Sequence, residues 1–222
     1  MKTSKVTLLA AISIAMAFTI SCSSDNNSDG GGTNPSSSSG DGGSDNTQGN
    51  SGTFTDTRDS KTYKWVKIDE QIWMAENLNY DIGNSPCNRN DPANCTKYGR
   101  LYDWATAMTA CPSGWRMPND AEWNALIVIA GGFQVAGAKL KAKSGWNNGG
   151  DGTDNYGFSA LPGGDANAAN ASSYIGERGY WWSSLEYAGI NAYFWRIEYN
   201  YISVDRSYTY KEKKHSVRCV QD

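Results

Sequence analysis

The distribution of aromatic residues is the feature that most constrains how this 222-residue chain can fold. All nine Trp, all thirteen Tyr and four of the five Phe lie in residues 53–222. Residues 23–52 contain nine Ser, eight Gly, five Asn and four Asp, with no aliphatic or aromatic side chain. Such a tract cannot bury a core, whereas the aromatic-rich segment can. We therefore expect one folded domain over 53–222, preceded by a disordered tether over 22–52.

Charge and histidine content exclude several kinds of function. From residue 53 onward, 18 Lys and Arg balance 19 Asp and Glu, so no basic field exists to attract nucleic acid. The single histidine, His215, rules out His-rich metal sites and leaves one possible imidazole base. We expect His215 to lie on an exposed terminal strand. A catalytic pairing with Ser183 or Ser184 is therefore disfavoured.

Residues 1–21 have the pattern of an export signal. Two lysines precede an apolar run over 6–20, which is short for a membrane span, and a polar tract follows directly. Thr19-Ile20-Ser21-Cys22 resembles the lipobox of bacterial lipoproteins, which implies cleavage before Cys22 and attachment of a lipid, with palmitate among its acyl chains. Several acyl chains would anchor the protein firmly to a membrane. The alternative is an ordinary secretory signal with an incidental cysteine.

The segment after the lipobox bears on which membrane face displays the domain. Residues 23–29 are rich in Ser, Asn and Asp, and resemble the acidic tag that sends some lipoproteins to the outer face of the outer membrane. Plain linker composition explains the same residues equally well. We expect an outer-membrane lipoprotein that faces the cell exterior.

The hydrophobic periodicity predicts an α+β fold, with two main helices in the first half and antiparallel strands at the end. Residues 63–75 alternate apolar and polar on either side of Asp69-Glu70, which predicts a hairpin. Helical spacing predicts a helix over 100–110. A second helix should begin after Asn119, which is a suitable N-cap, with Glu122 closing a capping box. Strand-like runs follow at 158–161, 180–184, 192–199, 202–208 and 216–220.

Four cysteines remain once Cys22 carries the lipid, and an even number in an exported chain predicts disulfides. Sequence alone leaves three pairings open. Proximity favours a local bridge between Cys87 and Cys95, which flank an irregular loop. Cys111 would then pair with Cys219 and join the last strand to the helical half. A metal–thiolate cluster is the alternative, but the chain lacks a Cys-x-x-Cys spacing.

A series of blocks recurs in order through the folded segment. Examples are Ile72-Trp73-Met74-Ala75-Glu76-Asn77-Leu78 and Cys111-Pro112-Ser113-Gly114-Trp115-Arg116-Met117-Pro118. The full series occupies 67–80, 98–104, 111–118, 122–123, 152–164, 180–184 and 216–220. These blocks resemble the Fibrobacter succinogenes major paralogous domain. The resemblance extends over nearly all of 62–222, and lipoprotein leaders with a low-complexity tether are typical of its members.

The resemblance implies a compact α+β domain related to C-type lectin-like folds and to formylglycine-generating enzymes, with a terminal disulfide. Trp115-Arg116-Met117-Pro118, followed by Glu122-Trp123, is similar to a block of those enzymes. Their copper-binding cysteine pair has no counterpart, because residues 180–217 contain no cysteine. The calcium-dependent sugar motifs of true C-type lectins are also missing. Neither the enzymatic nor the lectin chemistry therefore carries over.

One calcium candidate is independent of those motifs. The Gly-rich stretch 147–155 supplies the carboxylates of Asp151 and Asp154 and amide oxygens such as that of Asn155. Hard oxygen ligands of this kind are those that Ca²⁺ takes. The alternative is a solvated loop shaped by Asn, Asp and Gly turn chemistry.

Sugar binding needs exposed aromatic rings beside polar groups. Trp146 lies near the two aspartates of the Gly-rich stretch, and Tyr180, Trp181 and Trp182 precede Glu186. Adjacent residues of a strand point to opposite faces, so at most one of the two tryptophans belongs to the core if the sheet has a wet side. The alternative is that both are buried.

The terminal strands are rich in tyrosine and offer a second aromatic surface. They carry Tyr193, Tyr199, Tyr201, Tyr208 and Tyr210. These residues indicate either a half-exposed recognition sheet or the ordinary preference of tyrosine for strands.

We therefore expect a surface lipoprotein without catalytic activity that mediates adhesion by binding an extracellular polysaccharide, a glycoprotein or another surface protein. A structural component of the cell envelope is the second hypothesis. An enzyme is the third, since the chain has many carboxylates but no spacing that forces two of them together. A deep pocket with convergent carboxylates would indicate an enzyme, and a shallow aromatic platform would indicate binding.

Overall fold

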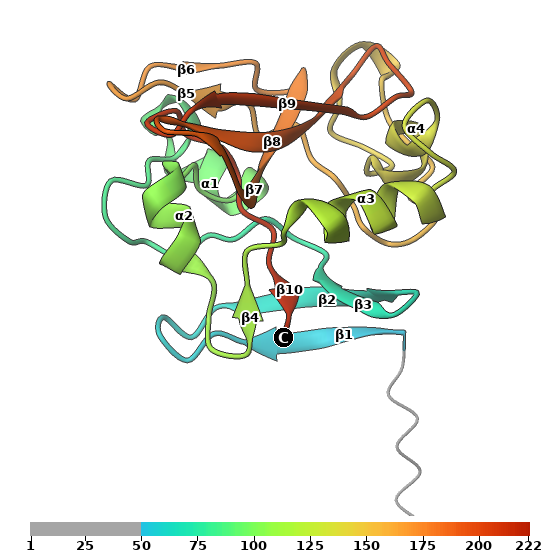
Figure 1. Cartoon of the computed structure of the whole chain (residues 1–222), viewed down its shortest axis with the longest axis horizontal. Coiled ribbons are helices and arrows are strands. Elements are labelled where there is room, and N and C mark those ends of the chain that lie inside the picture. Colours follow the sequence, from blue (N-terminus) through green and yellow to red (C-terminus); the bar gives the residue numbers. More distant parts are fainter. Residues whose placement is uncertain (1–49) are drawn as a thin grey trace, which may run out of the picture. The chain divides into compact units, whose positions relative to one another are not determined.

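A computed structural model describes residues 50–222 of the protein, which lie within one compact unit (Figure 1). The predicted export signal, Cys22 and nearly all of the predicted tether lie outside the described residues. Within 50–222, no helix is both long enough and apolar enough to span a bilayer. The first strand begins at Ser51, two residues before the start that we expected for the domain.

Short strands and short helices make up the domain. The strands are β1 (Ser51–Thr55), β2 (Thr62–Ile68), β3 (Gln71–Met74), β4 (Trp115–Arg116), β5 (Asp165–Ala166), β6 (Ser172–Ser173), β7 (Arg178–Ala188), β8 (Asn191–Glu198), β9 (Asp205–Tyr210) and β10 (Val220–Gln221). The α-helices are α1 (Pro92–Tyr98), α2 (Trp104–Ala110), α3 (Asp120–Ile129) and α4 (Ala136–Leu140), and the 3-10 turns are η1 (Asn88–Asn90) and η2 (Asn147–Gly149). This mixture of helices and strands is that of an α+β protein.

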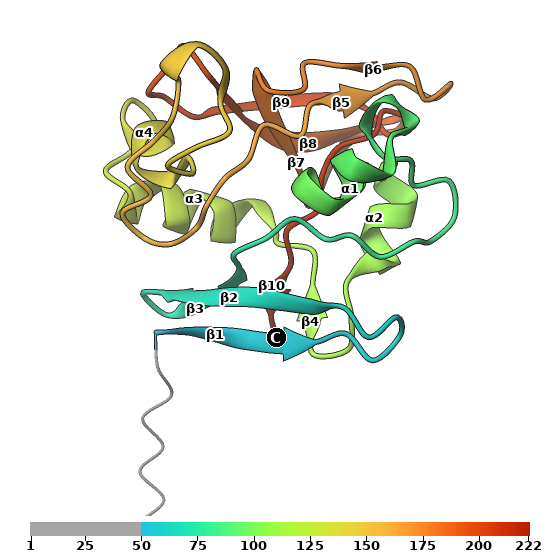
Figure 2. The ribbon, with the colours of Figure 1, turned by 180° about the vertical axis from the view of Figure 1, so that it is seen from behind.

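The first sheet joins the two ends of the domain. Its strand order is β1-β2-β3-β10-β4, and β10 is antiparallel to both of its neighbours. The predicted hairpin is confirmed as β2 and β3, which turn through Asp69 and its left-handed backbone. Figures 1 and 2 show this sheet at one end of the domain, with the sheet β7-β8-β9 at the other and helices between them.

Both predicted disulfides are present. Cys87 bonds to Cys95, and Cys111 bonds to Cys219, each with an S–S distance of 2.07 Å. The second bridge attaches the segment before β10 to the end of α2, as the proximity argument predicted.

Helix α3 forms where the sequence predicted it. The Asn119 side chain accepts the Glu122 backbone N–H, and the Glu122 carboxylate accepts that of Asn119, so the capping box is confirmed. Trp123 and Leu126 then face the core. The helix predicted over 100–110 begins only at Trp104, because the preceding residues extend to pair with the C-terminal segment.

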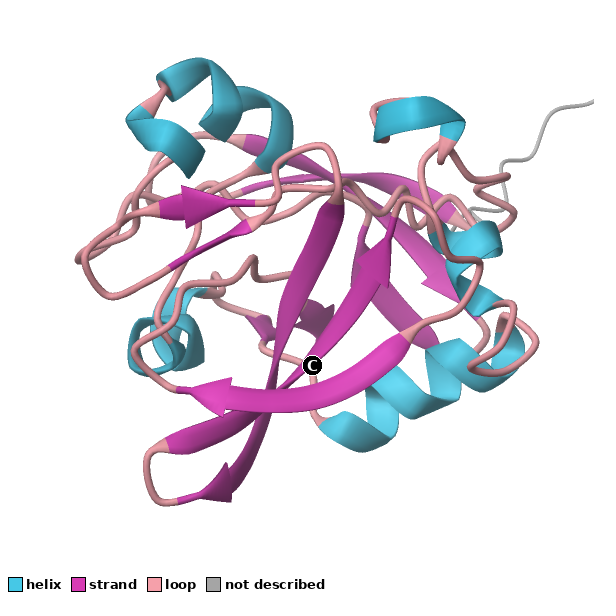
Figure 3. Cartoon of the chain, turned by 90° about the horizontal axis from the view of Figure 1, so that it is seen from above, coloured by secondary structure: helices cyan, strands magenta, loops and turns pink. Residues whose placement is uncertain are grey.

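The core occupies both faces of β7 and β8. Figure 3 shows the strands of this sheet from above. Trp181 packs toward α3, with its ring centroid 6.4 Å from that of Trp123. Trp182 points the other way, and its indole N–H donates to the Tyr102 carbonyl at 2.7 Å. The sheet has no wet side at these two tryptophans, because packed segments cover both faces of the strand, so the alternative that both are buried is confirmed.

Other local expectations also need correction. His215 is 2% exposed, since β7, β8 and the segment at Tyr102 enclose the C-terminal segment. Residues 158–161 form only an isolated bridge, and the run at 216–220 becomes a strand only at Val220. The loop between Cys87 and Cys95 contains η1 and the first turn of α1, neither of which was predicted from the sequence.

Candidate functional site

Most of the aromatic residues that we expected to contact a ligand are buried. Trp146, Tyr180, Trp181 and Trp182 are between 0% and 5% exposed. Trp146 is held by its indole N–H, which donates to the Ala160 carbonyl at 3.0 Å. The prediction of an exposed stacking platform at these four residues is therefore wrong, because tertiary packing covers them on every side.

Glu186 is the one residue of that group that lies at the surface. It sits on the distal half of β7, where its carboxylate pairs with the Lys211 ammonium at 2.9 Å. The half of β7 before Ser184 is buried, and the half from Ser184 onward projects beyond the core.

The carboxylates of the proposed calcium loop serve the loop backbone. Asp151 accepts the Trp146 backbone N–H at 2.9 Å. Asp154 accepts both the backbone N–H and the hydroxyl of Ser159, at 2.7 and 2.6 Å. Within 50–222, no three acidic, His or Cys side chains converge as metal ligands would. Turn chemistry explains this geometry, and calcium binding through Asp151, Asp154 and Asn155 stays a prediction.

An exposed tyrosine cluster lies on the projecting part of the sheet β7-β8-β9. Tyr187, Tyr193 and Tyr208 come from β7, β8 and β9, and we call them the tyrosine cluster. The rings of Tyr187 and Tyr208 stack with centroids 3.8 Å apart and planes inclined by 10°. Tyr193 packs edge-on against both. Tyr187 and Tyr208 remain 44% and 49% exposed, so part of this aromatic surface is accessible to a ligand.

The cluster is exposed because the sheet extends beyond its covering helix. On the same face of β8, Trp195 stacks on Trp123 of α3. Two residues earlier, Tyr193 has no helix over it. The Arg206 guanidinium lies 3.6 Å over the Tyr193 ring, and it pairs with Asp120 at the start of α3 at 2.6 Å. This ion pair fixes the cluster beside the helix terminus and places charged groups next to the rings.

Hydrogen bonding within the cluster affects its acidity. The hydrogen bond between the Tyr187 and Tyr208 phenols raises the pKa of Tyr187. The Tyr187 phenol is therefore protonated at neutral pH, and its hydroxyl group can donate to or accept from a ligand.

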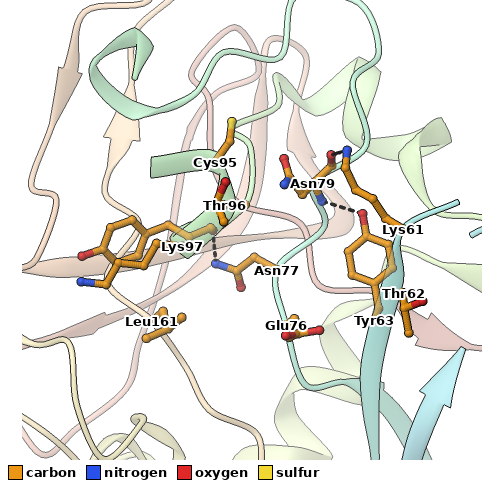
Figure 4. Close-up of a pocket in the computed structure, with 12 residues that line it drawn as sticks. Lys61, Thr62, Tyr63, Glu76, Asn77, Asn79, Cys95, Thr96, Lys97 and Leu161 are labelled. Carbon is orange, nitrogen blue, oxygen red and sulfur yellow. Dashed lines mark hydrogen bonds between the residues drawn. The ribbon is translucent and has the colours of Figure 1, made fainter. Parts of the chain in front are cut away.

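The second candidate is a groove made of two adjoining pockets. The first, of about 200 Å³, is lined by the start of β2, the segment after β3 and the end of α1. Figure 4 shows Lys61 and Lys97 on opposite sides of it, with Glu76 and Asn77 between them. The second pocket, of about 510 Å³, is lined by β1, β2 and the loops that follow α4, with Trp65 among its residues.

The groove brings together polar and aromatic groups but no carboxylate pair. Glu76 is the single acidic residue among those that line the two pockets. Its carboxylate is oriented by the Lys64 backbone N–H at 2.8 Å. Acid–base chemistry with two carboxylates, as in glycoside hydrolysis, therefore has no pair of groups at this groove.

The sequence predicts part of the tyrosine cluster but not the groove. Tyr193 and Tyr208 belong to the predicted tyrosine-rich terminal strands, and Tyr187 directly follows Glu186 in the aromatic group predicted to bind sugar, whereas Arg206 was missed. A polar and aromatic continuation of the run at 180–184 was the available signal for Tyr187. The groove was not predictable in this way, because its walls come from segments separated by up to about 100 residues.

Three comparisons place the chain among known proteins. No curated protein matches it, and no solved structure matches it. A family model described as the Fibrobacter succinogenes major domain matches residues 66–221, which include both disulfides, the groove's Glu76 and the tyrosine cluster. The match confirms the resemblance inferred from the ordered blocks. The chain belongs to the Fibrobacter succinogenes major domain family.

Proposed function

We propose that this domain is a non-catalytic module that binds an extracellular ligand, with carbohydrate as the favoured ligand and the tyrosine cluster as the contact surface. The exposed, pre-ordered stack of Tyr187 and Tyr208 is the observation that carries the proposal. Sugars present apolar C–H faces that pack on aromatic rings, while their hydroxyl groups need polar partners. The phenol hydroxyls, Arg206 and Asp120 supply such partners at the edge of the cluster.

A C-type lectin-like arrangement is part of the proposal. It is supported by the return of β10 to the sheet of β2 and β3, and by the disulfide from Cys219 to the helical half. We also propose display on the outer membrane through a lipid on Cys22. That part is supported by the lipobox-like sequence before Cys22.

A structural or protein-interaction role in the cell envelope is a second candidate. Strand β9 is at the edge of its sheet and pairs only with β8 among the described strands. An open edge strand can pair with a strand of another protein. Sedimentation of residues 46–222 without added ligand separates the two roles, since concentration-dependent self-association would favour the structural role.

The test of carbohydrate binding combines a glycan array with a pulldown on insoluble polysaccharides, using oxidised residues 46–222. We expect Tyr187→Ala and Tyr208→Ala each to weaken binding by about tenfold or more, as loss of an aromatic anchor does. Tyr201→Ala is the matched control, because Tyr201 is 55% exposed but makes no ring contact with the cluster.

Three outcomes decide the matter. Loss of binding in the two cluster variants alone supports the proposal. Equal binding by correctly folded cluster variants, or the absence of any bound glycan, contradicts it. A parallel measurement in EDTA tests calcium. Binding that is lost in EDTA and is not restored by magnesium would assign a role to Asp151 and Asp154.

A further inference from the structure

The two pockets share two of their lining residues. Glu76 and Leu161 line both of them, so the pockets adjoin at these two residues, and we call them together the Glu76 groove. It shares no lining residue with the tyrosine cluster. A ligand of the groove would therefore be recognised independently of the proposed tyrosine surface.

Lysines outnumber carboxylates along this groove. Lys61 and Lys97 line the first pocket and Lys64 lines the second, against the one carboxylate of Glu76. The Lys61 ammonium is paired with Asp59 at 2.9 Å. The Lys64 ammonium lies 3.9 Å from the Glu76 carboxylate and is 71% exposed, and Lys97 has no carboxylate partner in the described part of the chain. Two ammonium groups are thus available to an incoming anion.

A further positive charge lies directly beneath the groove. Arg218 is fully buried, and its guanidinium donates to the side-chain oxygen of Asn77 at 2.8 Å and to the Ser159 carbonyl at 3.3 Å. Asn77 lines the first pocket and Ser159 the second, so the guanidinium lies one residue behind both. Within 50–222 no carboxylate is within ion-pair distance of it; Asp154 and Glu76 act on it only from farther away.

This buried cation has no local counterion. Burial lowers the pKa of Arg218 to about 9, which leaves the guanidinium charged at neutral pH. A charge in a low-dielectric interior is screened weakly, so its field extends to the groove above it. The guanidinium therefore adds positive charge beneath the groove to that of the lysines at its rim, against the carboxylates of Glu76 and, behind Ser159, of Asp154.

The same groove offers surfaces for a sugar ring. The Trp65 indole and Leu161 provide apolar area, and Ser144 and Ser159 lie beside them. The second pocket has the size of an ordinary ligand site. Apolar ring contacts combined with cationic groups suit a ligand that has both a carbohydrate ring and a negative charge.

We infer that the Glu76 groove binds an acidic saccharide, a chain of uronic acid units whose rings lie against Trp65 and whose carboxylates face Lys64 and Lys97. The inference goes beyond the tyrosine surface and holds or fails separately from it. The negative charge of Glu76 repels the carboxylates of the ligand and lowers its affinity, so binding depends on the charge of the ligand.

The experiment is calorimetric titration of residues 46–222, one compact unit that contains the groove and both disulfides, with an oligogalacturonate. The fully methyl-esterified oligomer is the neutral probe of the same backbone. We expect Lys64→Gln and Lys97→Gln each to weaken oligogalacturonate binding by about two- to fivefold, as partly exposed charge pairs do. Glu76→Gln should tighten binding by a similar factor, because it removes the opposing charge and leaves an oxygen to accept the Lys64 N–H.

Lys67→Gln is the matched control, since Lys67 is exposed on the same strand β2 and lines neither pocket. Unchanged binding in Lys67→Gln, opposite effects of the lysine and glutamate changes, and no binding of the methyl ester would support the groove. Equal losses in Lys64→Gln and Lys67→Gln, equal binding of the neutral oligomer, or no binding by the folded domain would overturn it. Tyr208→Ala should leave this affinity unchanged, so that failure here and failure of the tyrosine surface are distinguishable.

Discussion

At the scale of single residues, burial decides the protonation state of His215. The imidazole lies among the rings of Tyr180, Trp182 and Phe194, with centroids 5.1, 4.4 and 4.9 Å away. Neither ring nitrogen has a hydrogen-bond partner among the described residues. Burial, with a smaller contribution from the positive charge of Lys213, lowers its pKa to about 3.

This burial makes stability depend on pH. In the unfolded chain His215 binds a proton below about pH 6.5, while in the folded chain its imidazole stays neutral at that pH. The stabilisation is fully present above that pH, and the free energy of unfolding should fall by about 1.4 kcal/mol for each pH unit below it. Urea unfolding at pH 7.5, 6 and 5 measures this slope.

The control for this prediction keeps an aromatic ring and removes the titration. His215→Phe should have a nearly flat free energy of unfolding over the same pH range. Glu122 does not confuse the comparison. Burial alone would raise its pKa, but the hydrogen bonds from Arg116 and the Asn119 backbone and the positive charge of Arg116 together lower it, so Glu122 contributes only at lower pH. An unchanged slope in His215→Phe would assign the pH dependence to other groups.

A second residue-scale prediction concerns Asn77. Its side-chain oxygen accepts from Arg218 at 2.8 Å and from the Trp181 indole at 2.8 Å, and its amide donates to the Tyr98 carbonyl at 2.8 Å. Asn77→Ala would remove a side-chain acceptor from the buried guanidinium of Arg218, so we expect a loss of about 3–5 kcal/mol in the free energy of unfolding. Asn79→Ala should cost far less, because within residues 50–222 Asn79 is hydrogen-bonded through its backbone and not through its side chain. Similar losses in both variants, measured by urea unfolding, would contradict this account.

At the scale of elements, the sequence predicted what local signals determine. The capping box places α3, and two apolar-rich, strand-like runs on either side of Asp69-Glu70 place β2 and β3. Helix α1 was missed because it follows Pro92 within a disulfide loop that reads as irregular. Strand β1 was missed because Ser51 and Gly52 continue the composition of the tether, and only pairing with β2 orders them.

The candidate site shows the same limit of local information. Trp181 and Trp182 alternate as strand residues should, but no local pattern reveals that α3 covers one face and the Tyr102 segment the other. Tyr193 and Tyr208 are the same residue type on paired strands, yet Tyr193 is half-buried and Tyr208 exposed, since α3 packs on Trp195 and not on them. Exposure depends on tertiary packing, so a sequence identifies candidate aromatic residues without showing which of them are exposed.

At the scale of the whole molecule, the connection of the last strand to the rest of the domain controls stability. Strand β10 lies between β3 and β4, and Cys219, just before it, is fully buried and bonded to Cys111. This bridge joins residues 108 apart, whereas the Cys87–Cys95 bridge joins residues 8 apart. A longer loop restricts the unfolded chain more, and the chain-entropy model gives about 4.7 kcal/mol for the long loop against about 2.6 for the short one.

The two bridges therefore predict unequal effects of removal. The double variant Cys111→Ala with Cys219→Ala should lose about 2 kcal/mol more than Cys87→Ala with Cys95→Ala, since each pair contains one buried cysteine and the loop lengths differ. Urea unfolding of the two variants and of the oxidised parent measures it, provided that the slopes against urea agree. Equal losses would mean that pairing of β10 with β3 and β4, and not the covalent bridge, holds the C-terminal segment in place.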